Sequence, residues 1–288
     1  MIPDKYPLEV GAKSETGYIR TDNQDCMSWV SVPWGQLFII ADGMGGHAGG
    51  AEAAYLTVNG LGRHLTEVSK NLPVEEAILS AFRKTNLDVY AKAHACDPAT
   101  EGMGSTAVML LIIDQAAKVA HVGDSRAYLY RNGKINLLTK DHTHVQRMVD
   151  AGMLTPEQAR NHPSASMLER AIGSKTTVTA DINSVSLREG DSILLCSDGL
   201  SGYADDKEIE TIINDLLSPQ ENVDRLINMA LQKGGEDNVT IQFIRFGKYL
   251  NIHRHGYKNI FKVLFLYALI IIIIIAVSFA VLEFVNDL

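Results

Sequence analysis

The chain has 288 residues, of which 46% are hydrophobic and 21% charged, with a formal net charge of −8 at pH 7. This composition is typical of a globular protein with one large or two small domains, and the acidic balance argues against the basic surface that nucleic-acid binding requires. The cysteines Cys26, Cys96 and Cys196 are odd in number and far apart. We therefore expect buried free thiols in a reducing compartment, and neither a disulfide framework nor a zinc knuckle.

Apolar patterns and turn residues predict strands followed by two helices, and this order occurs twice before a last strand. The first half is predicted to contain two strands within residues 17–32 around a polar turn at 20–25, a strand at 37–41, a glycine-rich loop at 43–50, helices at 51–71 and 74–95, and a strand at 105–113. We expect an α+β fold with antiparallel sheets and helices layered outside them.

The second half continues the same alternation after a strand that runs to Asp124. The predicted elements are a hairpin of 127–130 and 134–138 around Asn132-Gly133, strands at 177–186 and 191–197, helices at 205–217 and 219–233, and a strand at 238–246. Residues 141–175, called the flap below, are polar with short helical pieces. We interpret the flap as a mobile surface segment.

Four aspartates lie at the ends of predicted buried strands. Asp42, Asp124 and Asp198 each follow a short apolar run, and Asp237 comes shortly before another. Four such strand ends predict one sheet edge that gathers negative charge, where bare carboxylates would repel each other. A hard divalent cation with oxygen ligands removes this repulsion, so the pattern predicts a metal site of the Mg²⁺ or Mn²⁺ type.

Each of these motifs has a common alternative explanation. A single Asp-Gly pair is more often a plain turn, so the repetition is what favours a site. Arg20 lies near Asn23 and Asp25 on the polar turn, and its guanidinium suits a phosphate dianion, although a lone turn arginine is usually only solvated. The loop at 43–50 lacks the Gly-Lys-Ser/Thr ending of a nucleotide-binding loop, and simple flexibility is its alternative.

Other nucleophiles and ligands have poor context. Residues 199–202 are one residue short of a serine nucleophile elbow, and no cysteine is followed by an arginine six residues later. His142 and His144 resemble a metal-ligand pair, but their place in the flap favours surface histidines. His121 lies within a predicted strand, which favours a packed core residue.

The segment 263–282 is uncharged and apolar, with consecutive isoleucines at 270–275. At about 1.5 Å per residue, such a helix spans about 30 Å, the thickness of a bilayer core. A buried core helix is the alternative, but a soluble helix of this length normally has a polar face. Basic residues in the linker 247–262 precede it and acidic residues follow it, so the positive-inside rule predicts residues 1–246 in the cytoplasm and a short tail, 283–288, outside.

Six motifs together resemble the metal-dependent type 2C protein serine/threonine phosphatases in their bacterial form. They are Arg20-Thr21-Asp22-Asn23-Gln24-Asp25, Ala41-Asp42-Gly43-Met44-Gly45-Gly46, Gly104-Ser105-Thr106-Ala107, Val122-Gly123-Asp124-Ser125-Arg126, Ser197-Asp198-Gly199-Leu200 and Asp237-Asn238-Val239-Thr240. The resemblance covers about residues 10–246. It implies a catalytic domain at 1–246 with a four-layer α-β-β-α sandwich of two antiparallel sheets flanked by helices, and a flap at 141–175 that affects substrate choice.

The resemblance also implies a two-metal centre with Mn²⁺ or Mg²⁺ at one end of the sandwich. By position, Asp42, Asp198 and Asp237 would hold one ion. Asp25, Asp42 and the Gly43 carbonyl would hold or orient the second. Asp124, together with Asp198, matches the site of a third, weaker ion in bacterial members.

Arg20 matches the phosphate-binding arginine of the family. The residues expected to support the ligands from behind are Asn23, Gln24, Thr106 and Asn238. Two positions depart from the pattern of many members. Met44 stands where many animal relatives carry a histidine that is proposed as the general acid, so a metal-bound water must serve that role here. Gln24 stands where many members have glutamate, which weakens water-mediated support of the second ion.

We therefore expect metal-dependent hydrolysis of phosphoserine and phosphothreonine in proteins at the cytoplasmic face of the inner membrane, by activated water and without a covalent intermediate. The expected partners are phosphorylated proteins, together with a membrane serine/threonine kinase or a secretion or envelope assembly. Two alternatives stay open: a phosphatase-like domain that binds phosphoprotein without turnover, and a membrane assembly component.

Overall fold

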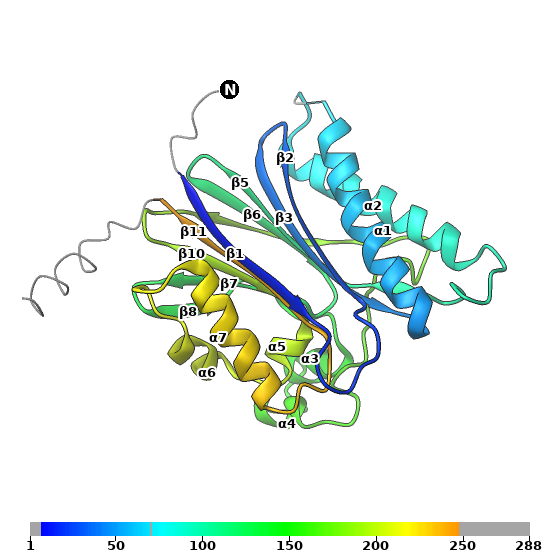
Figure 1. The fold of residues 1–288 in the computed structure, drawn as a ribbon. Coiled ribbons are helices and arrows are strands. Elements are labelled where there is room, and N and C mark those ends of the chain that lie inside the picture. The colour runs from blue at the N-terminus through cyan, green and yellow to red at the C-terminus, as the bar shows by residue number, and fades with distance from the viewer. Residues whose placement is uncertain (1–6, 70, 248–288) are drawn as a thin grey trace, which may run out of the picture. The chain divides into compact units, whose positions relative to one another are not determined.

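The structure is a computed structural model, and it describes residues 7–69 and 71–247. These residues all belong to one compact unit. The strands of the described part form two sheets in which every neighbouring pair is antiparallel (Figure 1).

The two sheets differ in strand order. The five-stranded sheet contains, in spatial order, β1 (Leu8–Glu15), β11 (Val239–Phe246), β10 (Ser192–Cys196), β7 (Arg126–Arg131) and β8 (Lys134–Leu137). The six-stranded sheet contains β2 (Asp25–Val32), β3 (Gly35–Met44), β5 (Ala107–Ile113), β6 (Ala116–Val122) and β9 (Asp181–Ser186), with the short β4 (Gly104–Ser105) paired to β3.

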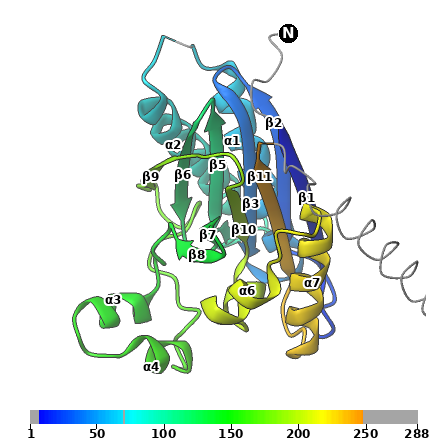
Figure 2. The ribbon, with the colours of Figure 1, turned by 90° about the vertical axis from the view of Figure 1, so that its left-hand side faces the viewer.

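Helices cover the outer faces of both sheets (Figure 1). The long helices α1 (Gly46–Glu67) and α2 (Val74–Ala93) pack on the six-stranded sheet, and α6 (Asp206–Ile212) and α7 (Pro219–Gln232) pack on the five-stranded sheet. The short α5 (Asp198–Ser201) follows β10 directly. The helical pieces expected in the flap are α3 (His144–Asp150) and α4 (Pro156–Arg160), which project beyond the sheets in Figure 2.

Three separate apolar cores establish the four layers. Alternate residues of β3 point to opposite faces, as the period of a strand requires. Leu37 and Ile39 pack against α1 and α2, whereas Phe38 and Ile40 pack against the five-stranded sheet. A third core joins that sheet to α6 and α7. The predicted α+β sandwich of two antiparallel sheets with helices outside is therefore confirmed for the described residues.

The strand register brings the predicted site residues to one end of the sandwich. Asp25 at the start of β2 lies directly opposite Asp42 near the end of β3. Because β10 and β11 are antiparallel, the residues after β10 lie beside those before β11, which places Asp198 near Asp237. Asp124 comes two residues after the end of β6. The topology thus gathers carboxylates that are far apart in the sequence.

The predicted hairpin at Asn132-Gly133 is confirmed, with positive φ angles of 54° and 74° at these residues. Several predicted boundaries were wrong, most clearly those of the first strand and the first helix. The first strand is β1 and not part of residues 17–32; it is a partly exposed edge strand whose apolar alternation is weak. Helix α1 begins at Gly46, inside the predicted loop at 43–50.

The glycines at the start of α1 serve close packing. A Cβ atom at Gly50 would collide with the Gln24 side chain, and one at Gly43 would overlap the Gly50 carbonyl oxygen. The helix can therefore approach the end of β3 only because side chains are missing there. The interpretation of this segment as a flexible loop missed that contact.

The cysteine environments vary. Cys196 is buried and Cys26 is half-buried, but Cys96 is exposed, so the expectation of buried thiols was wrong at that position. None of the three forms a disulfide in the described residues.

No helix within 7–69 and 71–247 is long and apolar enough to cross a membrane. The predicted membrane segment 263–282 and the tail 283–288 lie outside the described residues, as does the linker 247–262 after Gly247.

Candidate metal and phosphate site

A cleft of about 500 Å³ opens at the end of the sandwich where the aspartates meet. Four of the predicted carboxylate ligands line it together with Arg20: Asp42, Asp124, Asp198 and Asp237. Further lining comes from Gly43, Met44, Gln24, Thr106 and Asn238. Asp25 is half-buried and is not one of the lining residues. The structure therefore brings together residues from both sheets that the sequence analysis singled out separately.

The backbone of Asp42 is held on both sides. Its N–H donates to Thr106 Oγ1 at 2.9 Å, and its carbonyl accepts the Thr106 N–H at 2.8 Å and the Ser105 hydroxyl at 3.0 Å. Thr106 Oγ1 also lies 2.7 Å from Ser125 Oγ. Since every one of these groups is fixed by another, the Asp42 carboxylate is presented to the cleft from a rigid base.

Two of the buried carboxylates carry an oxygen without a hydrogen-bond partner. Ser197 Oγ donates to Asp25 Oδ2 at 2.8 Å, but Asp25 Oδ1 has no partner, and neither has Asp198 Oδ1. A buried polar atom without a partner is costly and calls for a missing ligand. Carboxylate oxygens are the donors that Mg²⁺ and Mn²⁺ prefer, so the donor set fits such an ion.

Crowding of these carboxylates makes them hard to ionise without a cation. Burial, with the nearby charges of Asp198 and Asp237, raises the pKa of Asp25 to about 7. Burial raises the pKa of Asp198 to about 6, and the Asp237 charge adds to this effect. The pKa values of Asp42 and Asp124 are also well above the ordinary value, through burial first and the Asp198 charge second. A divalent cation would reverse these shifts by favouring the charged forms.

Arg20 lies at the mouth of the cleft, with its side chain 53% exposed. Its Nε and Nη2 atoms each lie 2.9 Å from a different oxygen of Asp237. This parallel pair of bonds is the geometry with which an arginine also binds a phosphate. Asp237 raises the pKa of Arg20 through the hydrogen bond and its charge.

The polar turn before β2 is tied to the start of β11. Asn238 Oδ1 accepts the Gln24 N–H at 2.7 Å, and Asn238 Nδ2 donates to the carbonyls of Thr16 and Asp22. Gln24 Nε2 donates to the Gly46 carbonyl at 3.0 Å. Asn238 therefore fixes the turn that carries Arg20.

Asn23 positions the backbone of Asp25. Its Oδ1 accepts the Asp25 N–H at 3.0 Å, and its Nδ2 donates to Ser14 Oγ at 2.8 Å. The four residues expected behind the ligands thus occupy supporting positions, and their roles stay predictions.

Several residues of the site were not predicted from the sequence. Ser197 bonds Asp25 although 172 positions separate them, and Ile19, Ser166 and Leu168 line the cleft. Ser197 had only one local signal, its place directly before Asp198 at a strand end. For the flap, the resemblance implies that the segment borders the site, but no local pattern singles out Ser166 or Leu168.

The histidine expectations had mixed outcomes. His121 is 2% exposed, which confirms a packed core residue. His142 is 5% exposed, so the expectation of a surface histidine was wrong. The polar composition of the flap concealed that its first residues pack against β6, where the rings of His121 and His142 stack.

Comparison with known proteins agrees with this geometry. The protein phosphatase 2C family profile matches residues 19–238. The chain belongs to this family. The serine/threonine protein phosphatase PstP of Mycobacterium tuberculosis is 38% identical over 237 residues, covering 81% of this chain and 44% of the relative. The protein phosphatase PhpP of Streptococcus pneumoniae is 34% identical, covering 82% of this chain and 97% of the relative.

Solved structures share the fold. The S. agalactiae serine/threonine phosphatase has a TM-score of 0.78 and 32% identity, over 83% of this chain and 99% of that one. The catalytic domain of PstP in complex with two manganese ions has a TM-score of 0.74 and 33% identity, over 85% of this chain and 100% of that one. The chain spans less than half the length of full PstP but nearly all of PhpP.

Proposed function

We propose that the chain is a protein phosphatase that hydrolyses phosphoserine and phosphothreonine in proteins, with Mn²⁺ or Mg²⁺ as its cofactor. The observation that carries this proposal is the group of buried carboxylates, two of them with partnerless oxygens, beside an exposed arginine. Membership of the protein phosphatase 2C family supports the reaction, and the manganese-bound PstP domain supports the choice of metal.

The carboxylates divide into ligand sets. Asp42, Asp198 and Asp237 would hold one ion, and Asp25, Asp42 and the Gly43 carbonyl would hold the second. Asp124, with Asp198, would hold a third and weaker ion. When bound, such ions supply positive charge and lower the pKa of a water molecule at the site to near neutral.

The chain's own residues would bind and orient the phosphoryl group. Arg20 would donate two N–H groups to its oxygens, in the geometry that it now uses with Asp237. The Met44 side chain has no acidic proton to donate, so the departing serine or threonine oxygen would take its proton from water. The Thr106 hydroxyl is already engaged with Asp42 and Ser125. We therefore propose direct hydrolysis without a covalent intermediate.

We further propose that the apolar segment 263–282 anchors the protein in the inner membrane with its phosphatase domain in the cytoplasm. The uncharged segment and the basic residues before it support this location. Phosphoproteins at the membrane would then be its substrates, including a membrane serine/threonine kinase or components of a secretion or envelope assembly.

The test measures phosphate release from phosphoserine and phosphothreonine peptides by the purified full-length chain in detergent. We expect release with added Mn²⁺ or Mg²⁺ and its loss with a chelator. Asp198→Asn should lower kcat by at least about 100-fold, because it removes a charged ligand from the site. Asp88→Asn is the matched control, since Asp88 pairs with Arg63 on the exposed side of α2 and should leave kcat unchanged.

Two outcomes would contradict the proposal. Release that resists the chelator would reject the metal mechanism. Phosphopeptide binding with added Mn²⁺ but without turnover would favour the alternative of a phosphoprotein-binding domain, for which Gln24 is the supporting observation. Thermal melting of each variant establishes that the substitution has not unfolded the protein.

A further inference from the structure

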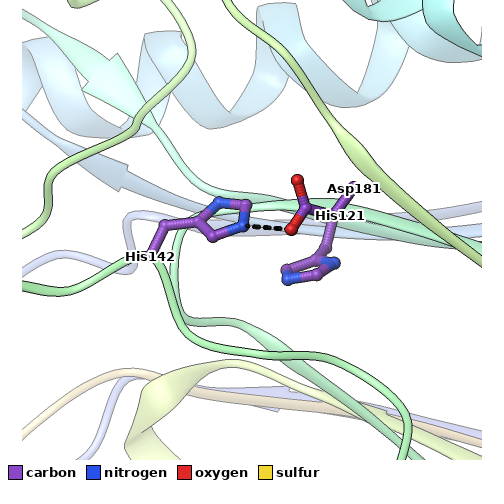
Figure 3. A group of neighbouring side chains, drawn as sticks. All are labelled: His121, His142 and Asp181. Atoms are coloured by element: carbon purple, nitrogen blue, oxygen red, sulfur yellow. Dashed lines mark ion pairs between the residues drawn. The ribbon is translucent and has the colours of Figure 1, made fainter. Parts of the chain in front are cut away.

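Two buried histidines and a partly exposed aspartate lie together beside the loop that carries Asp124 (Figure 3). His121 on β6 and Asp181 on β9 are register partners, and His142 comes from the first residues of the flap. The rings of His121 and His142 stack with centroids 4.6 Å apart, and His142 Nε2 lies 3.2 Å from Asp181 Oδ2. The roles proposed above use none of these residues.

His142 bonds Gly123 twice. Its N–H donates to the Gly123 carbonyl at 2.9 Å, and its Nδ1 accepts the Gly123 N–H at 3.2 Å. Gly123 has a φ of 98°, and a Cβ atom there would collide with the Thr106 side chain. The peptide that leads into Asp124 is therefore clamped between His142 and Thr106, whose hydroxyl also holds Asp42.

The same histidine aligns the far end of the flap. Its carbonyl accepts the Glu169 N–H at 2.8 Å, and the next residue, Thr143, forms an antiparallel bridge with Leu168. Leu168 and Ser166 line the cleft. One residue thus connects the Asp124 loop to the part of the flap that faces the substrate.

The proton positions argue against a metal ion among the three side chains, although their ligand atoms lie within 4.8 Å of one another. Burial and the neighbouring His121 lower the pKa of His142 to about 4, so the ring is neutral at neutral pH. Because Nδ1 accepts an N–H, the single proton resides on Nε2, which faces Asp181 and cannot ligate. Asp181 Oδ1 already accepts from Arg170 at 2.7 Å.

We propose that His142 is a positioning residue for the phosphatase reaction, holding the Asp124 loop through the bond from Gly123 and setting the flap register through its backbone. Asp181 and His121 keep the ring in place. The inference rests on the proposed function, because Asp124 is expected to hold the third, weaker ion. The imidazole itself touches no reacting atom.

Three substitutions separate the possible roles of the ring. His142→Asn places an amide oxygen where Nδ1 now lies, so it keeps an acceptor for Gly123 and loses Nε2. The longer side chain of His142→Gln places its amide farther from the backbone, so the acceptor for Gly123 is lost. His142→Phe keeps a ring of similar size and loses both nitrogens.

The readouts are amide hydrogen exchange at Gly123 and at 166–169, and calorimetric titration with Mn²⁺. We expect His142→Asn to stay within about twofold of the wild type in both. In His142→Gln and His142→Phe, the Gly123 amide should exchange about tenfold faster. Their weakest Mn²⁺ site should bind the ion about tenfold less tightly, as expected for one lost buried hydrogen bond. Asp181→Asn should leave Mn²⁺ binding unchanged.

Wild-type behaviour of His142→Phe would overturn the proposal, because the ring would then only fill space. A Zn²⁺ site that is present in the wild type and lost in both His142→Asn and Asp181→Asn would overturn it in favour of a metal site. If His142→Phe fails to fold, the difference between His142→Asn and His142→Gln still tests whether the acceptor for Gly123 is needed. Failure of the proposed function is distinguishable, since it would abolish phosphate release by the wild type while exchange at Gly123 stays measurable.

Discussion

Four carboxylates of the site, Asp25, Asp42, Asp124 and Asp198, lie in surroundings that oppose their own ionisation. Burial is the main cause at Asp25 and Asp198, and the other aspartates add repulsion. A bound cation would favour the charged forms, whereas without one the ionised carboxylates weaken the protein as the pH rises to neutral. A site of this kind exchanges protons for metal ions.

The first prediction at this scale is a pH dependence of the metal-free protein. The pKa values of about 7 for Asp25 and about 6 for Asp198 lie above the ordinary 3.8, so the folded state holds more protons than the unfolded state between these limits. Their contribution to the free energy of unfolding is present below pH 3.8 and is lost as pH rises through 6 to 7. Chemical denaturation in chelator, from pH 5 to pH 7.5, measures this fall.

Metal addition should reverse the effect. At pH 7.5, Mn²⁺ at a hundredfold excess over its dissociation constant should raise the free energy of unfolding by about 2.7 kcal/mol. The same Mn²⁺ concentration should stabilise the protein less at pH 5, because protons compete for the carboxylates and weaken binding. Asp25→Asn should flatten the metal-free pH profile. A profile that stays as steep in this variant would show that other groups cause it.

At the scale of elements, the helix starts illustrate what neighbouring residues decide. Three helices carry complete capping boxes, in which Thr155, Asp205 and Ser218 each exchange bonds with the residue three positions on. These signals agree with the helix starts predicted at 205 and 219. Helix α1 has no side-chain cap at Gly45, and its start was misplaced. Close packing of glycine backbone, and not capping, sets its first turn.

Ser218→Ala tests the contribution of one cap. Ser218 Oγ accepts the Glu221 N–H at 3.2 Å, and Glu221 Oε2 accepts the Ser218 N–H at 2.8 Å. Loss of this box should lower the free energy of unfolding by about 1 kcal/mol without changing kcat, because no residue of α7 lines the cleft. Thr211→Ala, exposed on α6, is the control and should change stability by less than about 0.5 kcal/mol.

At the scale of the whole molecule, the open question is where the catalytic unit works. Our proposal assigns the segment 263–282 to the membrane, which would confine the phosphatase to substrates at the inner surface. Deleting 263–288 should move the protein from the membrane fraction to the soluble fraction while phosphate release from soluble peptides is retained. A reporter enzyme that functions only outside the cytoplasm should be active when it is fused after Leu288.

The control for this experiment keeps the segment and changes its flanks. Replacing the basic residues of 247–262 by glutamine should lower the reporter activity or reverse the orientation of the segment, because the flank with more positive charge stays in the cytoplasm. If the deletion variant still sediments with membranes, the segment 263–282 is not the anchor.

The sequence by itself determined the alternation of elements, the Asn132-Gly133 hairpin and the aspartates at strand ends, because these depend on residues close together in the chain. Only the tertiary structure decided that His142 is buried, that Ser197 bonds Asp25 across the two sheets, and that Gly43 and Gly50 are points of contact. Burial and proton affinity depend on atoms that the fold brings from distant segments, and no local pattern records those distances.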